Sequence, residues 1–128
     1  MKKIILFFVI ILLSSSCEVL FDKGYRIRVE NNSNDTIQFY ESYIYPDTSI
    51  VREKPILKMA CPNKHSYIGS REKWKDVLHN DTISVFLISK DTFDTYGWGS
   101  IKFDYNILIR YDLSLKDLEN MNWTVTYP

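Results

Sequence analysis

The residues that could carry out acid–base or nucleophilic chemistry are few in this chain. The histidines are His65 and His79, and the cysteines are Cys17 and Cys61. Cys61 and His65 are four residues apart, which on a helix would bring a thiol and an imidazole together, but Pro62 and the turn residues after it disfavour a helix there. The pattern therefore favours a lone buried thiol at Cys61 and a surface histidine at His65.

Metal and cofactor motifs are also missing from the sequence. A zinc site needs three or four ligands, and no CxxC or HExxH spacing occurs. The four glycines form no phosphate-binding or dinucleotide-binding loop. Two carboxylate pairs, Asp91 with Asp94 and Asp104 with Asp112, could flank a glycosidic bond only if folding brought each pair within about 5–9 Å in a cleft. The simpler interpretation is that these aspartates are solvent-exposed turn residues. We therefore expect the protein to bind no metal or cofactor, to have no catalytic residue and not to be an enzyme.

An aromatic segment at 91–99 is the best candidate for ligand binding. Phe93, Tyr96 and Trp98 could stack on sugar rings, and the neighbouring aspartates could accept hydrogen bonds from sugar hydroxyls. The alternative is that Trp98 is buried at one end of the domain, while the glycines on either side of it make a turn. The same two interpretations apply to a second aromatic group, Tyr40, Tyr43 and Tyr45.

The dipeptide Asp-Thr occurs five times, so half of the ten aspartates precede a threonine. Local geometry accounts for this pattern, because Asp favours turns and Thr favours strands. The segments Asp35-Thr36-Ile37 and Asp81-Thr82-Ile83 also resemble the Asp-Ser/Thr-apolar acceptor sequence of the O-glycosylation system in bacteroidete envelopes. That resemblance implies a glycan on Thr36 or Thr82 of the exported protein.

The first 17 residues have the order of a bacterial export signal. Lys2 and Lys3 precede ten apolar residues, and three serines then lead to Cys17. A helix of ten residues spans about 15 Å, which is too short for a hydrocarbon core of about 30 Å. The segment LSSSC resembles the lipobox of bacteroidete-type lipoproteins, although Ser14 stands where the usual lipobox has Leu. The alternative is an ordinary secretory signal that is cleaved near the serines.

The lipobox resemblance has consequences for the whole chain. It implies a signal peptide at 1–16, a lipidated Cys17 with a short tether at 17–24, and a single domain at 25–128. With lipid on its sulfur, Cys17 could form no disulfide with Cys61. The protein also resembles small lipoproteins of the same type in its C-terminal strand–helix–strand segment. The resemblance implies a lipid-anchored protein of the outer membrane that faces the periplasm, with surface exposure as the alternative.

Charge restricts the partners further. Loss of Lys2 and Lys3 would leave 14 of the 16 basic residues against 16 acidic ones. No stripe of Lys or Arg occurs, so we expect no nucleic-acid partner. The expected function is that of a non-enzymatic binding or assembly module with an unidentified partner. The alternatives are a glycan-binding accessory lipoprotein and an immunity-type inhibitor of a periplasmic toxin.

Hydrophobic patterning predicts a mostly β domain. The segments expected as strands are 25–30, 36–45, 56–59, 65–68, 83–88, 101–103, 106–111 and 123–127, with the turn 31–35 joining the first two as a hairpin. Ser70 is expected to cap a helix over 71–78. Ser114 and Asp117 form a capping box for a helix through Met121. The expected fold is an antiparallel β-sandwich of about seven strands, immunoglobulin- or transthyretin-like, with two short helices in connections; a single α+β sheet is the alternative.

Overall fold

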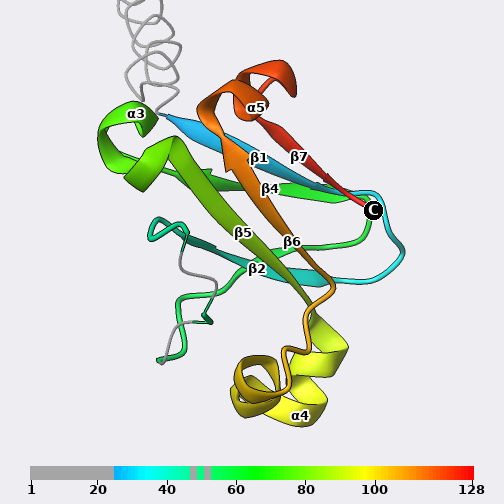
Figure 1. Ribbon diagram of the computed structural model, residues 1–128. Helices are drawn as coiled ribbons and strands as arrows, with labels where there is room; N and C mark the ends of the chain where they lie inside the picture. The colour runs from blue at the N-terminus through cyan, green and yellow to red at the C-terminus, as the bar shows by residue number, and fades with distance from the viewer. Residues whose placement is uncertain (1–24, 47–48, 51–52) are drawn as a thin grey trace, which may run out of the picture.

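The computed structural model describes residues 25–46, 49–50 and 53–128, which form a mostly β domain (Figure 1). The strands are β1 (Arg26–Asn31), β2 (Ile37–Ser42), β3 (Lys58–Ala60), β4 (Lys64–Gly69), β5 (Thr82–Ser89), β6 (Ile109–Ser114) and β7 (Thr124–Tyr127). The helices are α3 (Trp74–Val77), α4 (Lys90–Phe103) and α5 (Leu115–Asn120), with a 3-10 turn at His79–Asp81. None of the helices in these ranges is both long enough and apolar enough to span a membrane.

Two sheets make up the domain, as the β-sandwich prediction requires. The smaller sheet has the strand order β4-β1-β7 and the larger has the order β3-β2-β5-β6. The alternative of a single sheet is therefore wrong. One pairing departs from the prediction of antiparallel strands, because β7 runs parallel to β1. The chain reaches β7 from β6 through α5, a connection that crosses from the larger sheet to the smaller one instead of returning as a hairpin.

The predicted hairpin of the first two strands is also wrong, because β1 and β2 belong to different sheets. The turn between them is stabilised by Asn31, whose side chain is fully buried. Its Nδ2 donates to the carbonyl oxygens of Asp35 at 2.7 Å, Ala60 at 3.0 Å and Cys61 at 3.2 Å. The Asn31 amide at the end of β1 thus binds the residue pair before β2 and the end of β3. These hydrogen bonds stabilise the turn in which the chain passes from the smaller sheet to the larger one.

The main core lies between the two sheets. Alternation places Ile27 and Val29 of β1 on its inner face, opposite Ile83, Val85 and Leu87 of β5. A smaller core lies on the other face of the larger sheet and includes Ile50, Phe86, Ile88 and Ile101 with Tyr40. Strand β5 is therefore buried on both faces, which explains its continuous apolar run.

The predicted helices are partly confirmed. Ser114 accepts a hydrogen bond from the backbone N–H of Asp117, and the Asp117 carboxylate accepts from the backbone N–H of Ser114, so the capping box of α5 is confirmed. The helix expected over 71–78 is reduced to α3, and Ser70 does not cap it. The Ser70 hydroxyl instead accepts from the N–H of Glu72 at 3.1 Å, which forms a local turn before the helix.

Two strand predictions near the C-terminus need correction. Residues 101–103 belong to α4 and not to a strand, because Ile101 is buried on the small core as part of that helix. The strand expected at 106–111 begins three residues later, as β6. Its pairing with β5 matches Ile109 with Leu87 and Leu113 with Ile83, which places both apolar residues on the main core.

Candidate functional site

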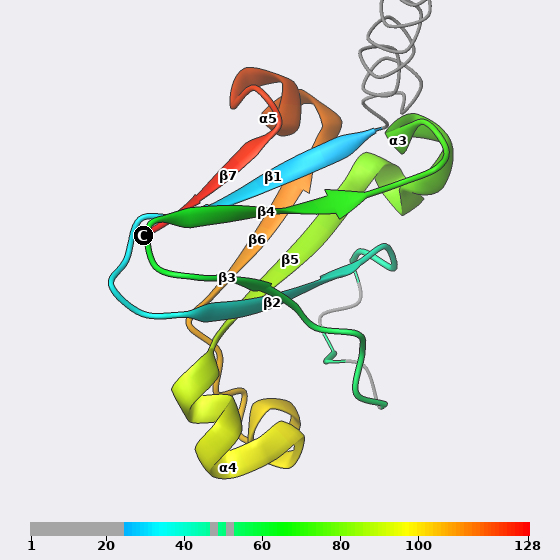
Figure 2. The same cartoon turned by 180° about the vertical axis from the view of Figure 1, so that it is seen from behind.

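Helix α4 occupies one end of the domain, beyond the ends of β5 and β6 (Figures 1 and 2). Ser89 caps its first turn and accepts a hydrogen bond from the N–H of Thr92 at 3.4 Å. The helix is broken in the middle by Gly97, whose φ of 74° lies in the left-handed region that favours glycine. The segment expected to be a loop or a helical turn is thus two helical pieces joined at a glycine.

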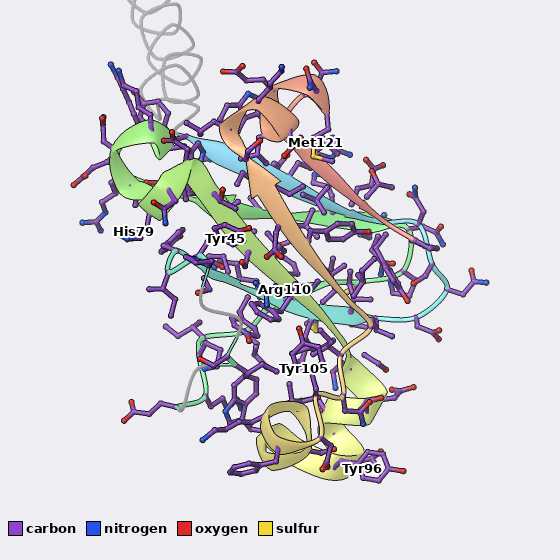
Figure 3. The ribbon with its side chains drawn as sticks, viewed as in Figure 1. Tyr45, His79, Tyr96, Tyr105, Arg110 and Met121 are labelled. Atoms are coloured by element: carbon purple, nitrogen blue, oxygen red, sulfur yellow. The ribbon has the colours of Figure 1, made fainter. Side chains whose placement is uncertain are left out.

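The three aromatic residues predicted to bind a ligand do not share one face of α4. Phe93 and Trp98 pack on the small core, and the Trp98 ring meets Tyr40 edge-on at 5.7 Å. Tyr96 lies on the opposite side, turned away from the sheets, with 67% of its surface exposed (Figure 3). Trp98 is half-buried against the small core, and the three rings do not form one flat stacking surface.

Beneath α4, three residues on neighbouring strands lie in one row across the larger sheet. Tyr40 of β2 is the register partner of Phe86 of β5, which is the partner of Arg110 of β6. The Tyr40 and Phe86 rings are stacked with centroids 4.7 Å apart, and the Arg110 guanidinium carbon lies 5.2 Å from the Phe86 centroid on the same row. The row is a continuous π and cation–π stack.

A polar group surrounds the Arg110 end of this row. Arg110 Nε donates to Asp112 Oδ1 at 2.8 Å, and Ser84 Oγ donates to the same oxygen at 2.6 Å. Burial lowers the pKa of Arg110, but its hydrogen bonds to Asp112 and Tyr105 outweigh this and raise that pKa. Figure 3 places Tyr105 between Arg110 and α4. Arg110 therefore stays charged. Burial also raises the pKa of Tyr40, so its phenol stays neutral.

The second aromatic group is also divided between environments. Tyr40 faces the small core, whereas Tyr43 packs against the main core and lies 6.3 Å from the ring of Trp74. The Tyr43 hydroxyl donates to Glu41 Oε1 at 3.3 Å, and Lys58 Nζ donates to both Glu41 oxygens at 2.6 Å. The backbone carbonyl oxygen of Tyr45 accepts a hydrogen bond from Asn80 Nδ2 at 3.1 Å. These tyrosines stabilise the fold and do not form one binding face.

The residues considered for catalysis lie apart from one another or in ion pairs. Cys61 is exposed, so the prediction of a buried thiol is wrong; the turn that ends β3 carries it outward. His65 of β4 is exposed, and its Nδ1 is 3.2 Å from the guanidinium of Arg28 on β1. His79 is exposed beside α3 (Figure 3). Of the carboxylate pairs, Asp94 pairs with Lys90 and Asp112 with Arg110. Within the described ranges no group of three or more metal-binding side chains occurs.

The residues predicted to be modified lie at element boundaries or outside the described ranges. Thr36 directly precedes β2 and Thr82 begins β5, and both are half-buried beside exposed aspartates. The Thr82 hydroxyl donates to the carbonyl oxygen of Asn80 at 3.0 Å. Cys17 and the signal and tether segments 1–16 and 17–24 lie outside the residues that the structure describes.

An exposed apolar surface at the α4 end was missed from the sequence. Four large side chains between 96 and 108 are exposed: Tyr96 at 67%, Phe103 at 79%, Tyr105 at 47% and Leu108 at 42%. We call these four residues the α4 surface. Phe103 and Leu108 fall in segments expected as strands, whose apolar residues would be buried. Phe103 stands between Lys102 and Asp104, and Leu108 stands inside the apolar run 107–109. Neither pattern marks an exposed side chain.

No protein-family model, no curated protein and no solved structure matches this chain.

Proposed function

We propose that this protein is a lipid-anchored, non-enzymatic binding module of the bacterial cell envelope, and that the α4 surface contacts its partner. The carrying observation is the exposure of Tyr96, Phe103, Tyr105 and Leu108 at one end of the domain. Tyr96 and Phe103 lie on α4, and Tyr105 and Leu108 lie in the connection from α4 to β6. Exposed large apolar groups at one end of a domain are typical of interaction surfaces. The signal-like segment and Cys17 support anchoring to the outer membrane, with the domain on the periplasmic side.

A protein partner suits the α4 surface better than a glycan does. Protein interfaces are enriched in tyrosine and phenylalanine, the residue types of three of the four side chains of the α4 surface. Trp98, the ring with the largest stacking area for sugars, packs on Tyr40 instead. If the captured partner were a periplasmic toxin, the module would be an immunity-type inhibitor.

The anchor is tested with the two cysteines as a matched pair. The full chain is produced in a bacterium that is fed alkyne-labelled palmitate, and the Cys17→Ala variant is compared with Cys61→Ala. We expect label on the wild type and on Cys61→Ala, and its complete loss in Cys17→Ala together with release from the membrane fraction. Acylation that survives Cys17→Ala would remove the anchor from this proposal.

The binding surface is tested by site-specific photocrosslinking in cells that produce the protein naturally. A photoreactive residue replaces Tyr96 on α4 or, as the control, Tyr67 on β4, which is 42% exposed. We expect one discrete crosslinked protein from position 96 and none of that mass from position 67. Phe103→Ser in the same background should reduce this product at least about tenfold while changing the free energy of unfolding by less than about 0.5 kcal/mol.

The outcome for the glycan alternative is separate. A glycan array probed with the wild type and Tyr96→Ala would show sugar binding that depends on the exposed ring. Such binding, without a crosslinked protein from position 96, would replace the protein partner by a glycan. Equal crosslinking from positions 96 and 67 would contradict the α4 surface as the contact site.

A further inference from the structure

The start of the described domain lies at the end opposite to α4. The carbonyl oxygen of Tyr25 accepts a hydrogen bond from the N–H of Ser70 at 2.9 Å, and Arg26 is the register partner of Gly69. The chain therefore enters the domain directly beside the segment that leads into α3. Figures 1 and 2 show from both sides that β1 begins beside α3, with α4 at the far end.

The segment around α3 presents basic side chains from a fixed backbone. Trp74 is only 2% exposed and anchors this turn to the main core, whereas Lys73 and Lys75 on either side of it are exposed. Arg71 is exposed as well, and the guanidinium of Arg26 lies 5.7 Å from the ring centre of Tyr67. We call Arg26, Arg71, Lys73 and Lys75 the α3 surface. Two acidic residues, Glu72 and Asp76, are exposed among them, so the group carries a positive balance in a chain of net charge +0.

We propose that the α3 surface binds the phosphate groups of anionic phospholipids, so that the domain stands on the membrane with the α4 surface directed away from it. This inference rests on the proposed anchor at Cys17. Seven residues lie between Cys17 and Tyr25, and the eight steps of a fully extended chain from one to the other reach about 28 Å at most. A lipid on Cys17 therefore keeps the α3 surface within reach of the headgroups, where basic side chains are attracted to anionic lipid.

The sequence of the tether favours the same arrangement. Val19, Leu20 and Phe21 are apolar, and such residues lower their free energy at the membrane–water boundary. The α4 surface then projects toward partners in the periplasm, as the proposed binding module requires.

The orientation can be measured with the acylated full chain in vesicles. A fluorophore is attached to Glu72→Cys beside α3 or to Thr95→Cys on α4, both in a Cys61→Ser background, and quenched by a nitroxide on the lipid headgroups. The vesicles contain phosphatidylcholine with or without 30% phosphatidylglycerol, the anionic lipid that gives their surface a negative charge. With phosphatidylglycerol present, we expect quenching at position 72 to be at least about threefold stronger than at position 95.

Charge is tested by two triple variants that remove the same number of cations. Arg71, Lys73 and Lys75 are replaced by Ser in one, and Lys54, Lys64 and Lys102 are replaced by Ser in the control. We expect the first variant to lose the difference between positions 72 and 95, and the control to keep it. Both should remain acylated and should sediment with the vesicles.

The outcomes separate this inference from the anchor itself. Equal quenching at the two positions in acylated wild-type protein would overturn the orientation while leaving the anchor in place. A difference that persisted without phosphatidylglycerol or in the first triple variant would overturn the phosphate contact, because charge would then play no part in the orientation. Absence of acyl chains on Cys17 in the mass spectrum would overturn both the anchor and the orientation.

Discussion

The phenol ring of Tyr40 lies parallel to the ring of Phe86, with centroids 4.7 Å apart and planes inclined by 2°. The Tyr40 hydroxyl is buried and has no hydrogen-bond partner among the described residues. A buried hydroxyl without a partner costs about 1–3 kcal/mol. We therefore expect Tyr40→Phe to keep the free energy of unfolding or to raise it by about 1 kcal/mol, as measured by urea denaturation.

Truncation of the other ring of the pair, Phe86, is expected to lower the free energy of unfolding. Phe86→Ala removes the middle of the row and leaves a cavity under α4, with an expected loss of about 3–4 kcal/mol. A loss above about 1 kcal/mol in Tyr40→Phe would mean that the hydroxyl makes a stabilising hydrogen bond, and would contradict the packing described for this row.

Asn31 is expected to be the most sensitive polar side chain of the sheet connections. Its replacement by Ala leaves the carbonyl oxygens of Asp35, Ala60 and Cys61 without the amide that they share. The expected loss in free energy of unfolding is about 2–3 kcal/mol. Asn32→Ala, at the exposed neighbouring position, is the control and should cost less than about 0.5 kcal/mol. Equal losses in the two variants would contradict this role of Asn31.

The capping box of α5 gives a prediction at acid pH. Hydrogen bonds from the hydroxyl and backbone N–H of Ser114 lower the pKa of Asp117 below 3.8. The folded state therefore binds this proton less readily than the unfolded state, so the stabilisation is present above pH 3.8 and is lost as the pH falls through the lowered pKa. Ser114→Ala should return this pKa toward 3.8 in a carboxyl-detected NMR titration. It should also cost about 1 kcal/mol at neutral pH; an unchanged titration would argue against the capping box.

Tyr43 gives the corresponding prediction at alkaline pH. Burial and the neighbouring Glu41 carboxylate raise the pKa of Tyr43 from 10.0 to about 12. The folded state then keeps the phenol proton that the unfolded state releases, so stability is full below pH 10 and falls as the pH rises toward 12. Tyr43→Phe should flatten this part of the stability profile. A profile that is the same in the wild type and in Tyr43→Phe would contradict the burial of this phenol.

The two Asp-Thr sites give a prediction for a host that has the O-glycosylation system. Intact-mass spectrometry of the exported protein should show a glycan that Asp81→Ala removes from Thr82, and that Asp35→Ala removes from Thr36. Both threonines lie at the start of a strand and directly follow an exposed aspartate, which places them close to solvent. Thr95, which also follows an aspartate but precedes no aliphatic residue, is the internal control and should stay unmodified.

The local signals in the sequence predicted the elements that depend on local energetics. Alternation identified β1 and β7, the continuous apolar run identified β5, and the capping box identified α5. Each signal reports a property of neighbouring residues, namely which face of a strand is buried or which N–H group a side chain satisfies. Glu41 is a charged residue at an otherwise apolar position of the alternating pattern of β2. The structure accounts for it, because the Glu41 carboxylate forms an ion pair with Lys58.

The strand partners and helix α4 could not be predicted from neighbouring residues. The choice between a hairpin and a crossover after β1 depends on Asn31 meeting Ala60, which lies 29 residues away. Helix α4 contains two glycines and two threonines, all weak helix formers, and it is stabilised by Trp98 and Ile101 on the small core. The α4 surface was missed for the same reason, because segments assigned to strands were expected to bury their apolar residues.

The parallel pairing of β1 with β7 also constrains when the domain can fold. Strand β1 has one of its two neighbours only when residues Thr124–Tyr127 are present. During synthesis the small sheet therefore stays incomplete until residues Thr124–Tyr127 have been made and can pair with β1. A stop codon or a carboxypeptidase that removed the final five residues would expose the middle strand of that sheet, and would leave Ile27 and Val29 without a closed core.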